Sequence, residues 1–250
     1  MLVIPSEAEE STFDLKSTVG PSASVGTTVR RKMPWQISQK LIAEKILSGI
    51  EKAQKEYDEW SGGDPFWTAP EYLLTTNIAR SIADIDCTKY ITLENSTSGA
   101  IKDAGAFTRG CLSRKARPHG RVDILLWWGT TYNNGNIYPR AVIEVKHNVY
   151  SYAHIAHDID RIEKVVLKNY SGNTLQFGAI AFYTARDDGK IKTASEKIQY
   201  ILDKIESEAK KDKRLKKFHV KLVNKLHKDG DSAWTAACLM LIPQNNTGEK

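Results

Sequence analysis

The alternation of apolar and polar residues divides most of the chain into helices and strands. Over residues 36–60, apolar side chains recur at spacings of three and four, which is typical of a helix with one buried face. The same spacing predicts a second helix that begins near residue 70, and further helices over residues 152–170 and 192–211. Four helices are therefore expected.

Short runs of β-branched, aromatic and other apolar residues predict the strands. The segment Asn133-Asn134-Gly135 favours a tight turn, so the strands on either side of it should form an antiparallel hairpin. Residues 96–120 are polar and contain glycine, and we expect them to form a loop. The predicted strands cover residues 90–95, 122–128, 137–147, 175–184, 218–226 and 234–242.

The order of these elements predicts an α/β fold with a mixed central β-sheet flanked by helices. Residues 1–30 are rich in Ser, Thr, Gly and acidic residues without apolar periodicity, so we expect a flexible N-terminal tail. Residues 31–250 should form a single domain, because a chain of 250 residues with 41% hydrophobic residues can bury one sizeable core.

The charge of the chain favours a polyanionic partner. There are 36 Lys and Arg against 30 Asp and Glu, a formal net charge of +6. The apolar run over residues 233–242 is too short to span a membrane, and the first residues do not resemble a secretory signal. We therefore expect a cytoplasmic protein with no membrane association. Three widely spaced cysteines argue against a disulfide framework.

Three charged residues stand within otherwise apolar strands. Glu144 and Lys146 are two residues apart, so their side chains should lie on the same face of the sheet. If the hairpin places Asp123 opposite Glu144, the two carboxylates are close enough to share a hard cation such as Mg²⁺. The alternative is structural: Glu144 and Lys146 form an ion pair at a strand end, and Asp123 accepts hydrogen bonds from a loop.

The order of these residues resembles the PD-(D/E)XK nuclease superfamily, whose core is helix, three strands, helix, strand. The resemblance covers about residues 68–184, and the Gly120-x-x-Asp123 form is most similar to the RecB-like and restriction-endonuclease-like members. Val122 stands where the family has proline. The resemblance implies a restriction-endonuclease-like αβββαβ core, with the helix over 36–60 and the helix and hairpin over 192–242 lying outside it.

The resemblance also implies roles for individual residues. Asp123 and Glu144 would be metal ligands together with the carbonyl of Val145, and Lys146 would be the catalytic lysine. Glu71 would be the acidic residue of the first core helix. Thr68-x-x-Glu71 is equally a capping box, in which the glutamate only stabilises the helix start, so both interpretations of Glu71 stay open.

Basic residues precede the first acidic ligand. They either contact the phosphate backbone of a nucleic acid beside the cut or are simply solvated. The candidates are Arg109, Arg114, Lys115, Arg117 and Arg121.

Two pairs of residues after Lys146 each have two possible roles. Asp158 and Arg161 form either a helix-surface pair or a contact in which Arg161 points back at the site. Tyr150 and Tyr152 either pack or contact a sugar or base.

These observations predict a Mg²⁺-dependent nuclease, with Mn²⁺ as a substitute, that hydrolyses phosphodiester bonds in DNA rather than RNA. Its size suits an endonuclease of restriction or phage-defence type. A homodimer would place two centres for a double-strand cut, and the helix over 36–60 is the element to examine for it. Two other classes stay open, namely a nucleic-acid-binding module without turnover and a structural subunit.

Overall fold

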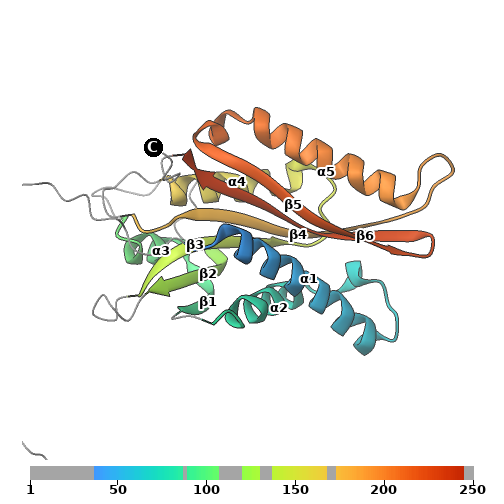
Figure 1. Cartoon of the computed structure of the whole chain (residues 1–250), viewed down its shortest axis with the longest axis horizontal. Helices are drawn as coiled ribbons and strands as arrows, with labels where there is room; N and C mark the ends of the chain where they lie inside the picture. The colour runs from blue at the N-terminus through green and yellow to red at the C-terminus, as the bar shows by residue number, and fades with distance from the viewer. Residues whose placement is uncertain (1–36, 87–88, 107–119, 130–136, 168–172, 245–250) are drawn as a thin grey trace, which may run out of the picture. The chain divides into compact units, whose positions relative to one another are not determined.

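Six strands form one mixed sheet in the order β1-β2-β3-β4-β6-β5 (Figure 1). Strands β3 and β4 run parallel to each other, and the other neighbours are antiparallel. The computed structural model describes residues 37–86, 89–106, 120–129, 137–167 and 173–244. The strands are β1 (Lys89–Ser96), β2 (Arg121–Gly129), β3 (Ile137–Lys146), β4 (Phe177–Asp187), β5 (Phe218–Asp229) and β6 (Ser232–Pro243).

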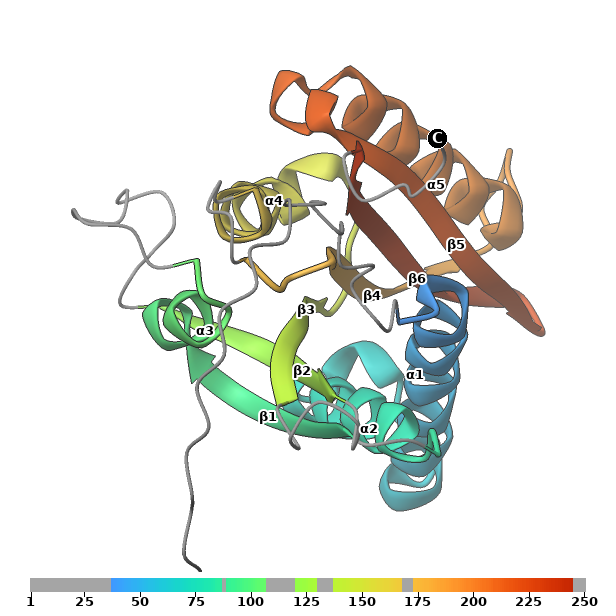
Figure 2. The same cartoon turned by 60° about the vertical axis from the view of Figure 1, so that its left-hand side comes forward.

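Helices cover both faces of the sheet, so the predicted α/β class with a flanked mixed sheet is confirmed. Helices α1 and α2 lie on one face, and α4 and α5 lie on the other, as Figure 2 shows. The helices are α1 (Gln39–Ser61), α2 (Glu71–Ala83), α3 (Thr97–Asp103), α4 (Tyr152–Val166) and α5 (Ala194–Lys211), with 3-10 turns η1 (Phe66–Thr68) and η3 (Lys213–Lys217).

Alternation along β3 decides which side chains reach which helical layer. Ile143 and Val145 belong to the core under α1 and α2, whereas Val142 belongs to the core under α4 and α5. Glu144 and Lys146 are two and four residues after Val142, so their side chains lie on the same face of β3 as Val142. They therefore lie on the α4 side of the sheet, as predicted from their spacing. The strand therefore carries charge on one face and only apolar residues on the other at its carboxyl end.

The structure corrects one predicted loop. Helix α3 occupies residues 97–103, where we expected only a polar loop. Its N-cap is Ser96, whose hydroxyl accepts a hydrogen bond from the backbone N–H of Gly99, and Ala100 and Ile101 are fully buried. A polar seven-residue helix with two apolar positions has too little periodicity to be recognised.

Several predicted features lie outside the described residues. These are the N-terminal tail over residues 1–30, the turn at 133–135 and most of the basic segment between residues 107 and 119. Within the described part of the chain, the helices are too short or too polar to cross a membrane.

Candidate functional site

The pairing of β2 with β3 brings the two predicted carboxylates together. Ile124 pairs with Ile143 in this antiparallel ladder, and Asp123 and Glu144 are the next residues outward on the two strands, close enough for the charge of Asp123 to act on Glu144. The Oδ2 atom of Asp123 accepts a hydrogen bond of 2.7 Å from the backbone N–H of Val145. Asp123 is therefore held against the backbone between Glu144 and Lys146, and the predicted proximity is confirmed.

Glu144 is the most buried charged residue of this group, with an exposed fraction of 0%. Burial raises the pKa of its carboxyl well above the ordinary value, and the negative charge of Asp123 raises it further. The guanidinium of Arg161 opposes this rise through a direct contact with Oε2 of Glu144. The other carboxylate oxygen, Oε1, is buried and lacks a hydrogen-bond partner among the described residues.

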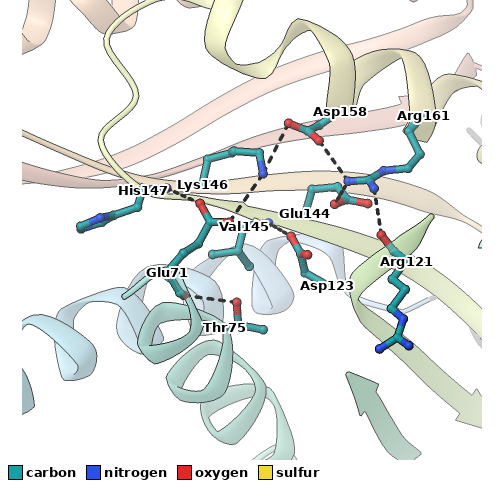
Figure 3. A network of polar contacts seen from close by, with 10 residues as sticks. All are labelled: Glu71, Thr75, Arg121, Asp123, Glu144, Val145, Lys146, His147, Asp158 and Arg161. Atoms are coloured by element: carbon teal, nitrogen blue, oxygen red, sulfur yellow. Dashed lines mark hydrogen bonds and ion pairs between the residues drawn. The ribbon is translucent and has the colours of Figure 1, made fainter. Parts of the chain in front are cut away.

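The ammonium of Lys146 lies between two carboxylates from opposite helical layers (Figure 3). Its Nζ atom is 3.6 Å from Oε1 of Glu71 on α2 and 3.7 Å from Oδ2 of Asp158 on α4. Burial alone would lower the pKa of Lys146, but the surrounding acids outweigh burial and raise it above the ordinary value. The surroundings of Lys146 therefore favour the protonated form of its ammonium.

Glu71 is tied to the end of β3 and does not form the predicted capping box. The N-cap residue of α2 is Pro70, which makes no side-chain capping bond, and the hydroxyl of Thr68 donates to the carbonyl of Pro65. The carboxylate of Glu71 instead accepts a hydrogen bond of 3.0 Å from the backbone N–H of His147. The capping interpretation of Glu71 is therefore wrong, and its carboxylate lies beside Lys146 at the end of β3.

Asp158 and Arg161 form a buried pair, so the helix-surface interpretation of this pair is wrong. Their side chains are 7% and 8% exposed, and Arg161 Nη2 lies 3.0 Å from Oδ1 of Asp158. Arg161 also donates a hydrogen bond of 2.8 Å to the carbonyl of Arg121. One guanidinium thus links α4, β2 and, through Glu144, β3, which is the second of the two predicted arrangements.

A helical pattern was available to identify Asp158. It lies three residues after Ile155 and four before Ile162, which places it on the buried stripe of α4. A charged residue in such a stripe requires a partner, and here the partners are Arg161 and Lys146. The spacing in the sequence is thus a signal for Asp158.

The described oxygen atoms fit a hard divalent cation. Asp123 and Glu144 supply carboxylates, the carbonyl of Val145 is the further ligand implied by the family resemblance, and the unpartnered Oε1 of Glu144 is a buried acceptor that a cation would satisfy. No cluster of three or more His, Cys, Asp or Glu side chains in a metal-binding arrangement occurs among the described residues. Water and substrate oxygens would complete such a site, as they commonly do for Mg²⁺.

Of the five predicted basic contacts, Arg121 alone is described. Its side chain is exposed at the start of β2 and points away from the carboxylates in Figure 3. Arg109, Arg114, Lys115 and Arg117 lie outside the described residues.

The chain was compared with protein-family models, with curated proteins and with solved structures, and none of the three comparisons gave a match.

Proposed function

We propose that this chain is a metal-dependent nuclease that hydrolyses phosphodiester bonds in DNA and resembles the PD-(D/E)XK superfamily. The observation that carries the proposal is the position of Lys146. Its ammonium is held by Glu71 and Asp158 at the end of the strand that also carries Glu144, beside the paired carboxylate of Asp123. A structural ion pair would need one acid, whereas this lysine has acids on both sides.

The two carboxylates beside Lys146 assign it the role of a charged hydrogen-bond donor. A protonated ammonium that is 27% exposed donates hydrogen bonds to a group at the surface of the site. In phosphodiester hydrolysis, such a donor orients the attacking water or stabilises the negative charge that grows on the phosphate oxygens in the transition state. Glu71 and Asp158 fix the position of the ammonium, so that little reorganisation is needed when substrate binds.

Asp123, Glu144 and the carbonyl of Val145 are the residues that would hold Mg²⁺, with Mn²⁺ as a substitute. A bound divalent cation would neutralise charge on the scissile phosphate and make water a better nucleophile near neutral pH. One carboxylate of this candidate metal position comes from each of two neighbouring strands, and the backbone N–H of Val145 holds Asp123 by a hydrogen bond. Arg161 holds Glu144 from the opposite side.

The remaining parts of the proposal follow from composition and from the family resemblance. The net charge of +6 supports a polyanionic substrate. DNA rather than RNA, an endonuclease of restriction or phage-defence type, a homodimer and a cytoplasmic location are proposed on the resemblance and the sequence features.

A second candidate function is a nucleic-acid-binding module without turnover. The contact between Arg161 and Glu144 favours it, because a guanidinium already neutralises the carboxylate that would bind the metal. The two candidates differ in a measurable way. A nuclease binds a divalent cation at Asp123 and Glu144, whereas a module of this kind does not need one.

The test is cleavage of supercoiled plasmid, linear duplex, single-stranded DNA and RNA in Mg²⁺, Mn²⁺ or EDTA. Lys146→Ala is expected to lose at least about 100-fold in rate, the loss typical of a transition-state donor. Lys164→Ala is the matched control, because Lys164 lies on α4 with a 35% exposed side chain and pairs with Glu163. Equal cleavage by both variants, or cleavage that persists in EDTA, would overturn the proposal.

A further inference from the structure

Exposed aromatic side chains flank the segment that follows Lys146. Tyr150 is 41% exposed, Trp67 is 43% exposed and Tyr72 is 57% exposed. Tyr150 lies within this segment, and Trp67 is joined to it because its carbonyl accepts a hydrogen bond of 3.2 Å from the side-chain amide of Asn148. Tyr72 follows Glu71 directly. Exposed aromatic rings therefore come from residues near the end of β3 and near the start of α2.

The ring of Tyr150 is held in a defined orientation. The guanidinium carbon of Arg186 lies 3.9 Å from the ring centroid, in cation–π geometry. The ring of His154 meets it edge to face, with centroids 5.6 Å apart and an interplanar angle of 66°. The Nδ1 atom of His154 also accepts a hydrogen bond of 3.1 Å from the backbone N–H of Tyr150. These contacts fix the orientation of the Tyr150 ring.

Arg186 brings a positive charge to the same place. It forms no ion pair with a carboxylate among the residues that the structure describes, and its Nη1 donates to the carbonyl of Ala185 at 2.7 Å. Lys146 pairs with Phe182 across the parallel strands β3 and β4. Arg186 follows Phe182 by four residues on β4, and its contact with the Tyr150 ring places that ring beside the carboxyl end of β4, next to the strand that carries the lysine.

The platform of Tyr150, Arg186 and His154 lies close to the lysine. His154 and Asp158 are one turn apart on α4, a rise of about 6 Å. Asp158 in turn lies 3.7 Å from the ammonium of Lys146. A nucleotide whose phosphate sits at Lys146 therefore has its neighbours within reach of the Tyr150 ring.

We propose that Tyr150, backed by Arg186, is a stacking platform for an unpaired base of the substrate next to the scissile phosphate. Bases in a duplex are stacked on one another, whereas unpaired bases stack on aromatic side chains and on guanidinium planes. The substrate class is therefore nucleic acid with single-stranded nucleotides at the cut. This inference rests on the proposed function, because it assigns the substrate of that site.

The test measures binding without cleavage. Fluorescence anisotropy of the full chain in EDTA compares a labelled single strand, a blunt duplex and a duplex with a single-stranded flap. We expect the single strand and the flap to bind more tightly than the blunt duplex. Tyr150→Ala should weaken binding of these two by about 5- to 100-fold, the usual effect of losing one stacked base, and leave duplex binding unchanged.

Tyr90→Ala is the matched control. Tyr90 is 44% exposed and stacks on Trp127, but it pairs with Trp127 on β2, four residues along the strand from Asp123. Its removal should leave the binding of all three probes unchanged. Equal affinities for the Tyr150 and Tyr90 variants, or preference for the blunt duplex, would overturn the platform.

The experiments test the stacking platform and the nuclease assignment independently of each other. If the wild type cleaves DNA and Tyr150→Ala binds single strands normally, the platform is wrong and the nuclease assignment stands. If Tyr150→Ala loses single-strand binding but the wild type cuts no substrate in Mg²⁺ or Mn²⁺, the platform stands and the nuclease assignment fails.

Discussion

The carboxylate of Glu71 lies 3.6 Å from the ammonium of Lys146 and at the same time accepts a hydrogen bond from the backbone N–H of His147. The first residue of α2 thus holds both the side chain and the backbone at the end of β3. A helix-capping glutamate would instead bond to its own helix, so the contact gives Glu71 a role that depends on the strand.

The substitution Glu71→Gln distinguishes the contact with Lys146 from helix capping. Glutamine also completes a capping box, but it lacks the charge that pairs with Lys146. We expect cleavage to slow by about 10- to 100-fold, because the ammonium loses one of its two anchors. Stability should change by less than about 1 kcal/mol, since the Glu71 side chain is 43% exposed.

Rates and urea denaturation of Glu71→Gln are compared with Glu59→Gln, whose carboxylate forms an exposed pair with Lys55 on α1. Unchanged activity in both variants would show that Glu71 has no part in the site.

Removing Arg161 should destabilise the fold. Arg161→Met leaves the carboxylates of Glu144 and Asp158 buried without their guanidinium, which costs about 3–5 kcal/mol in comparable sites. Chemical denaturation in EDTA measures the change. Arg80→Met is the control, because the Arg80 side chain is 72% exposed and its loss should cost less than about 1 kcal/mol. Similar costs for both variants would contradict the buried role of Arg161.

Mg²⁺ should rescue part of this loss. A divalent cation at Glu144 would replace the missing positive charge, so Arg161→Met is expected to be less destabilised in saturating MgCl₂ than in EDTA. The comparison uses the same denaturation curves with wild type as reference. Identical destabilisation in both buffers would show that no cation binds beside Glu144, and would favour the binding module.

The contact between η3 and α4 predicts a loss of stability in acid. Hydrogen bonds from Arg214 lower the pKa of Asp212 to about 2 against the opposing effect of burial, and the hydroxyl of Tyr152 adds a further bond. A lowered folded pKa stabilises the protein above the ordinary pKa near 3.8, and this contribution is lost as the pH falls toward 2.

Asp212→Asn removes the titrating group. The stability difference between wild type and this variant should shrink by about 1 kcal/mol between pH 5 and pH 2, as allowed for a partly solvated pair. Denaturation across this pH range measures it. A difference that stays constant with pH would show that Asp212 does not titrate with folding.

Two glycines allow close approach of packed elements. A Cβ on Gly49 of α1 would lie 2.5 Å from the backbone Cα of Ile78 on α2, and one on Gly178 of β4 would lie 2.1 Å from the side-chain Cγ2 of Ile162 on α4. We expect Gly49→Ala to lower the free energy of unfolding by about 3 kcal/mol or more, because backbone must move. Gly178→Ala should cost a similar amount, because the methyl group in its way belongs to Ile162, a fully buried β-branched side chain with little freedom to turn on a helix. Urea denaturation measures both changes, and a loss of less than about 1 kcal/mol in either variant would contradict this prediction.

Much of the fold follows from local pattern because each strand and long helix carries its own periodicity. Lys146 and Glu144 lie on one face of β3 because alternation places them there, and the antiparallel pairing of β2 with β3 brings Asp123 close to Glu144. The contacts that complete the site join residues far apart in the chain. Glu71 reaches His147 across 76 positions, and no local spacing specifies that approach.

The roles of Tyr150 and Tyr152 also depend on contacts that local sequence does not specify. Tyr150 and Tyr152 look alike in sequence, yet the hydroxyl of Tyr152 bonds to Asp212, whereas Tyr150 reaches solvent beside Arg186. Asp212, the N-cap residue of η3, and Arg186 on β4 both come later in the chain than the tyrosines they contact. Only the packing of those elements separates a structural tyrosine from one that is available to a ligand.

Because Lys146 is anchored once in each helical layer, the centre is completed late in synthesis. Helix α2 leaves the ribosome well before α4, so a nascent chain that ends before Asp158 has only the Glu71 anchor. Glu144 likewise lacks its contact with Arg161 until α4 has been synthesised. The arrangement of these charged side chains therefore depends on both helical layers being folded onto the sheet.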